Sequence, residues 1–92
     1  MNRDAAELFA VQVLGWLADD HARIGAFLAW SGESAASLRE RVNDPAFLLA
    51  VIEFLMMDEA NLLQACQALD VRPETPQQAK AALPGGEDVH WT

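Results

Sequence analysis

The fold of this chain is decided by residues 43–59, which read NDPAFLLAVIEFLMMDE. Asp44 is a favoured N-cap residue and Pro45 is favoured at the first helical position, so the pair predicts the start of a helix. From Pro45 to about Met57, only Glu53 is charged. A helix that is apolar nearly all round packs at the centre of a bundle or beneath a second subunit.

Further helices are predicted on both sides of this stretch by helical apolar spacing and by residues that start or stop helices. Gly32 is placed where a left-handed residue would end a helix. No segment shows the two-residue alternation of a strand. The sequence therefore predicts an all-α fold, a compact globular bundle of five to six short helices. The other expected helix starts are Asp4 with Glu7, Asp19 with Asp20, Ser34, Asp58 with Glu59, and Thr75 with Pro76.

The length of 92 residues predicts one domain, because chains divide into domains only at larger sizes. Pro84-Gly85-Gly86 stops the last expected helix, so we expect a single helical domain over residues 1–84 and a flexible C-terminal tail over residues 85–92. The hydrophobic fraction, 52%, is high for a domain with so much surface per volume. Some apolar side chains are therefore expected to be exposed or covered by a second subunit.

The charge balance is 14 acidic against 6 basic residues, a net charge of −8. This disfavours nucleic acid and anionic membranes as partners, because both reward clusters of Lys and Arg. The lone Cys66 cannot form an intramolecular disulfide and fits a reducing compartment. Met1–Glu7 lack a positive leader region, and the uncharged stretch Leu8–Ala18 is shorter than the ~20 residues of a membrane span. The expected location is the cytoplasm.

Several of these segments together resemble a family of short all-helical bacterial proteins, mostly alphaproteobacterial, that is catalogued only as a domain of unknown function. The similarity covers roughly residues 4–84 and implies a compact all-helical protein. It implies no activity, substrate or site. The residues that carry it are Leu14–Asp20 (LGWLADD), Phe27–Gly32 (FLAWSG), Asp44–Leu48 (DPAFL) and Phe54–Ala60 (FLMMDEA).

Three groups of residues could in principle support chemistry, and each has a simpler structural interpretation. Cys66 lies on an apolar helical stripe, and a buried thiol is unreactive. His21 follows Asp19 and Asp20, but the two acids are expected as caps, and no second His or Cys stands at ligand spacing. The pair Asp58-Glu59 opens a helix, where the macrodipole favours acids. We therefore expect no catalytic residues, no metal and no cofactor.

A helix-turn-helix is a further alternative, with Gly32 in the turn and Arg39 and Arg41 on the second helix. Glu33 and Glu40 offset these two arginines, and the chain as a whole is acidic. Because DNA affinity depends on attraction to phosphates, the sequence argues against nucleic-acid binding.

The best candidates for a working surface are Trp16, Trp30 and Met57, with Phe9 seven residues before Trp16. Trp is enriched at binding hot spots and Met adapts to varied partners, although the same residues would also fill a core. We expect a non-enzymatic protein-protein interaction module whose partner is another protein or a second copy. Two alternatives remain: a regulatory domain that binds a small apolar ligand, and an acidic regulator of a basic nucleic-acid-binding protein.

Overall fold

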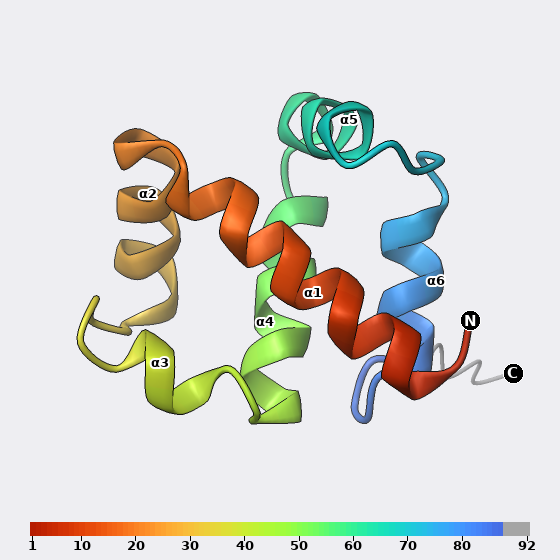
Figure 1. Ribbon diagram of the computed structural model, residues 1–92, viewed down its shortest axis with the longest axis horizontal. Helices are drawn as coiled ribbons and strands as arrows, with labels where there is room; N and C mark the ends of the chain where they lie inside the picture. The colour runs from red at the N-terminus through yellow and green to blue at the C-terminus, as the bar shows by residue number, and fades with distance from the viewer. Residues whose placement is uncertain (88–92) are drawn as a thin grey trace, which may run out of the picture.

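The computed structural model describes residues 1–87, and within them it shows six α-helices and no β-strand. The predicted all-α fold is confirmed. In Figure 1 the long helix α1 lies diagonally across α4, with α2 and α3 on one side, α6 on the other and α5 at one end. The bounds are α1 Arg3–Ala18, α2 His21–Ser31, α3 Leu38–Arg41, α4 Pro45–Met56, α5 Glu59–Ala68 and α6 Thr75–Ala82.

The core forms chiefly where α1 crosses α4. Helix α1 contacts α2, α4, α5 and α6, so apolar residues on several of its sides are covered. Helix α4 contacts α1, α2, α5 and α6 and buries six of its twelve residues. The wide apolar arc of α1 and the nearly all-apolar α4 are thus explained mainly by packing against neighbours within one chain. The buried residues of α4 are Phe47, Leu48, Leu49, Val51, Ile52 and Leu55.

Three predicted N-caps are confirmed. Asp20 Oδ1 accepts hydrogen bonds from the backbone N–H of Ala22 and Arg23, and Asp44 Oδ1 accepts one from Ala46 at 2.9 Å. Asp58 Oδ1 accepts one from Asn61 at 3.2 Å. Each bond satisfies a donor in the first turn that has no partner within the helix. Gly32, with φ of 77°, ends α2 in the predicted left-handed conformation.

Two other expected helix starts are wrong. Helix α1 begins earlier than Asp4, because Asn2 Oδ1 accepts the N–H of Ala5 at 2.8 Å, and Glu7 pairs with Arg3 rather than completing a capping box. Ser34 does not cap α3, because it exchanges hydrogen bonds with Ser37 in a loop turn that precedes the helix. Helix α3 therefore starts only at Leu38 and is four residues long.

The sixth helix begins one residue earlier than expected. Glu74 holds the N-cap position and Thr75 is already helical, so Thr75 is not the cap. No side-chain hydrogen bond caps this helix.

The folded domain continues past the expected boundary at residue 84. Gly85 adopts φ of 85° and its N–H donates to the Glu87 carboxylate at 3.0 Å. Gly86 is buried beside the carbonyl of Lys80 and the side chain of Leu49. Gly86 therefore packs against α4 and α6, whereas Gly85 and Glu87 are exposed, and the remainder of the expected tail, residues 88–92, lies outside the described residues.

Candidate functional site

Phe9 and Trp16 lie in the core, with only 4% and 8% of their surface exposed. The Arg23 guanidinium lies 3.9 Å from the centroid of the Trp16 ring, and its Nη1 donates to the Trp16 carbonyl at 3.4 Å. This cation–π contact covers the indole from α2. The expectation that Phe9 and Trp16 belong to an exposed surface therefore does not agree with their burial in the core.

Trp30 and Met57, in contrast, are exposed and lie together. Trp30 is near the end of α2 with 44% of its surface exposed, and Met57 follows α4 with 64% exposed. Both line one surface hollow of about 450 Å³. Glu53, Met56 and Lys80 complete its lining, so α2, α4 and α6 all contribute to it.

The indole of Trp30 is held by an aromatic cluster. Its ring centroid lies 5.4 Å from that of Phe54 and 6.3 Å from that of Phe27. Phe27 is fully buried and makes edge contacts with Phe54 at 5.4 Å and with Phe47 at 5.8 Å. Such pairs stabilise beyond the area they bury. The cluster therefore fixes one side of Trp30 and leaves another side exposed to solvent.

A second hollow of about 280 Å³ adjoins Trp30 and lies over the first half of α4. Ala46, Ala50, Glu53 and Met57 follow one another at spacings of four, three and four residues, which places them on one face of the helix. The first two line the second hollow and the last two line the first. We call the lining of these two hollows the Trp30 surface: Trp30, Ser31, Glu33, Arg41, Ala46, Phe47, Ala50, Glu53, Met56, Met57 and Lys80.

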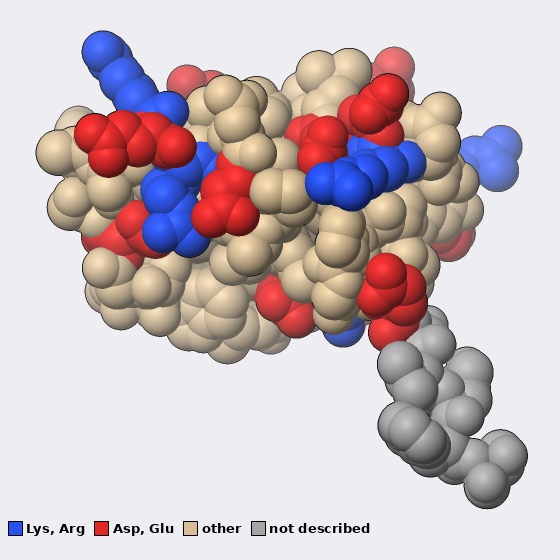
Figure 2. Space-filling model, turned by 90° about the horizontal axis from the view of Figure 1, so that it is seen from below, with Lys and Arg blue, Asp and Glu red and all other residues tan. Residues whose placement is uncertain are grey.

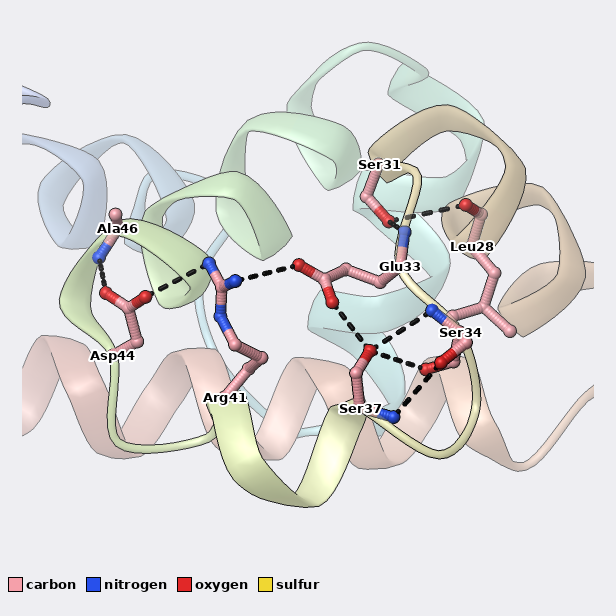
Figure 3. A network of polar contacts seen from close by, with 8 residues as sticks. All are labelled: Leu28, Ser31, Glu33, Ser34, Ser37, Arg41, Asp44 and Ala46. Carbon is pink, nitrogen blue, oxygen red and sulfur yellow. Dashed lines mark hydrogen bonds and ion pairs between the residues drawn. The ribbon is translucent and has the colours of Figure 1, made fainter.

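One edge of the second hollow is a chain of polar contacts (Figure 3). Ser37 donates to Glu33 at 2.6 Å, and the other oxygen of Glu33 pairs with Arg41 at 3.2 Å. Arg41 also forms an ion pair with Asp44 at 3.0 Å. The other carboxylate oxygen of Asp44 accepts the hydrogen bond that caps α4. These contacts hold the loop after α2 and the single turn α3 against the start of α4. The Arg41 charge is therefore used within the domain.

The first hollow carries two charges of opposite sign. Glu53 and Lys80 are both half-buried, and within residues 1–87 neither forms an ion pair or a side-chain hydrogen bond. On the face that Figure 2 presents, acidic and basic side chains are interspersed. That face carries no continuous acidic patch.

A smaller hollow of about 150 Å³ lies beside the exposed side of α1. Leu8 and Val11, which are 60% and 40% exposed, line it together with Val42 and Leu48. It contains no aromatic residue, and Glu7 is the one charged residue among those that line it. Leu8 therefore gives a natural comparison for Met57, since both are exposed aliphatic side chains on different faces.

Among the residues considered above as candidates for catalysis or metal binding, the cysteine is buried and the aspartates cap helices in the structure. Burial, and to a smaller extent the charge of Glu74, raise the pKa of the Cys66 thiol, so it stays protonated at neutral pH. Hydrogen bonds from the backbone N–H of Arg23 and Ala22 lower the pKa of Asp20, as its capping role requires. In residues 1–87 no three His, Cys, Asp or Glu side chains gather as a metal site. His90 lies outside these residues.

Sequence reasoning found Trp30 and Met57 but missed Glu53, Met56 and Lys80 as members of the same surface. The spacing of Ala46, Ala50 and Glu53 was the available signal, because two small residues and one charged residue fall on the same face of an otherwise apolar helix, in line with Met57. Nothing local could indicate that Lys80 from α6 would join them.

The comparisons with known proteins bear on the family of the chain. No helix within residues 1–87 is long and apolar enough to cross a membrane. No curated protein and no solved structure matches the chain. A family model matches residues 3–86, a range that contains all six helices and the whole Trp30 surface. The resemblance to a domain of unknown function is thus confirmed, and the chain belongs to the family described as protein of unknown function (DUF3572).

Proposed function

We propose that this protein is a non-enzymatic interaction module that binds protein through the Trp30 surface, in the cytoplasm of a bacterial cell. The observation that carries the proposal is that Trp30 and Met57, which are 44% and 64% exposed, line one hollow together. Trp often dominates binding energy, and the unbranched Met side chain adapts to a partner. The aromatic cluster beneath Trp30 reduces the entropy lost when a partner orders it.

The composition of the surface supports binding rather than catalysis. Catalysis requires a nucleophile or an acid–base group held by an orienting partner within reach of a substrate. At the second hollow, Glu33 and Arg41 neutralise each other and connect to Asp44. At the first hollow, the chemistry is one carboxylate and one amine among apolar side chains.

A protein partner is supported over nucleic acid by the charge and by the shape of α3. The net charge is −8, and α3 is a single turn of four residues, too short to serve as a recognition helix. Asp20, Asp44 and Asp58 are used as helix caps, which leaves fewer acids for an acidic regulator. No specific observation favours that alternative or a small apolar ligand.

The test is capture of partners from a lysate of the source cells by tagged wild-type, Met57→Glu and Leu8→Glu proteins. The two substitutions place the same charge at exposed aliphatic positions, with exposures of 64% and 60%. We expect Met57→Glu to reduce recovery of a bound protein by about tenfold or more, because the change removes the apolar contacts of Met57 and the new carboxylate must lose water when a partner covers it.

Leu8→Glu is the matched control and should retain the bound protein. Equal recovery with both variants would contradict the proposal, as would a complete lack of bound protein with the wild type. The untagged chain counts as a partner in this experiment, so binding to a second copy is also detected.

A further inference from the structure

The half-buried charges at the first hollow constrain what can cover it. Glu53 of α4 and Lys80 of α6 line the hollow with Trp30, Met56 and Met57, and neither charge is paired within residues 1–87. A partner that covers this hollow removes water from both groups. Burying a charge without a counter-charge is costly, so the hollow favours a partner that brings a base to Glu53 and an acid to Lys80.

A second copy of the same surface meets this requirement by symmetry. In a two-fold interface, residue i of one copy contacts residue j of the other, and the reverse contact follows. If the axis passes between Glu53 and Lys80, each Glu53 faces the Lys80 of the other copy. The exposed side chains of Trp30 and Met57 are then covered by the equivalent apolar surface. A purely basic peptide would leave Lys80 without a counter-charge, and an acidic one would leave Glu53 without one.

We propose that the occupant of the first hollow is a second copy of this chain, bound with two-fold symmetry through reciprocal Glu53–Lys80 ion pairs. This inference rests on the proposed function and names its partner. Each copy carries a net charge of −8, so the two copies repel one another at long range. Charges on the far faces are screened beyond about 8 Å at physiological salt, so the pairs at the contact outweigh them. Lys80 is the only lysine in the chain, and Glu53 is the only charged residue of α4.

The experiment is light scattering coupled to size exclusion, over a concentration series, of the full chain and its charge-reversed variants. The wild type should dimerise. Glu53→Lys alone and Lys80→Glu alone should each raise the dissociation constant by about tenfold or more, because each places like charges opposite one another twice. Mixing these two variants in equal amounts should restore dimers. In the mixed pair, lysine at position 53 faces glutamate at position 80, and Lys80 faces Glu53.

The double variant Glu53→Lys/Lys80→Glu keeps the net charge and should dimerise like the wild type. Glu40→Lys and Arg72→Glu are controls that make the same changes of net charge at exposed positions, and both should leave the dimer unchanged. Circular dichroism melting identifies any variant that fails to fold. If one single variant does not fold, the double variant still tests the pairing.

Three results would overturn the inference. They are a monomeric wild type at every concentration, a dimer that neither single reversal weakens, and weakened single variants that neither mixing nor the double change restores. None of these alone sinks the proposed function. If Met57→Glu still abolishes capture of another protein while the chain is monomeric, the surface binds a different partner. If Met57→Glu changes neither capture nor dimerisation, the function itself fails.

Discussion

Replacing Phe27 with alanine should lower the free energy of unfolding by about 3–5 kcal/mol, the range for truncating a buried aromatic side chain. Phe27 is fully buried, and its ring contacts those of Trp30, Phe47 and Phe54. The truncation removes these contacts and leaves a cavity between α2 and α4. Because small domains have a stability of about 5–15 kcal/mol, this is the largest loss we expect from one substitution.

Chemical denaturation followed by circular dichroism measures this loss. Leu8→Ala is the control, because Leu8 is 60% exposed and its truncation should change stability by no more than about 0.5 kcal/mol. A loss below about 1 kcal/mol for Phe27→Ala would contradict the position of Phe27 in the core, since a fully buried ring cannot be removed so cheaply.

Gly86→Ala should destabilise the domain by about 1–3 kcal/mol, the range for adding a group to a packed region. A Cβ atom at this position would overlap the backbone carbonyl oxygen of Lys80 and press on the side chain of Leu49. The clash with Lys80 involves backbone, so relief requires the segment after α6 to move. The same substitution should disturb Lys80 and thereby weaken the dimer that we propose forms at the first hollow.

Gly15→Ala provides a control of opposite sign. A Cβ at Gly15 meets no atom within 4 Å, and the residue lies within α1. Alanine is more favourable than glycine inside a helix by about 0.5–1 kcal/mol, so this variant should be stabilised. Thermal unfolding of the two variants should therefore shift in opposite directions. A Gly86→Ala protein that is as stable as the wild type would show that Gly86 does not pack against Lys80 and Leu49 as described.

The helical architecture was predictable because most of its determinants are local. Asp20, Asp44 and Asp58 cap helices through bonds to residues two or three positions ahead, which a sequence pattern records directly. The prediction that Ser34 caps a helix was wrong because of another local interaction. Ser37 competes for its hydrogen bonds within a turn, and two serines three residues apart are both plausible caps.

The division of the tryptophans between core and surface could not be predicted from the sequence. Trp16 and Trp30 both lie on apolar helices, and their exposure is decided by contacts between helices. Arg23 covers Trp16 from the next helix, whereas Trp30 remains 44% exposed. Glu53 and Lys80 line the same hollow only because α6 packs beside α4, and these two helices are far apart in the sequence.

Site-specific photocrosslinking in the source cells tests the proposed interaction surface most directly. A photoreactive amino acid replaces Met57 in one protein and Leu8 in another, two exposed positions on different faces of the domain. We predict covalent adducts to protein from position 57, including a crosslinked dimer of this chain, and none above background from position 8. Adducts of equal yield from both positions, or none from position 57, would contradict the assignment of the Trp30 surface as a protein-binding site.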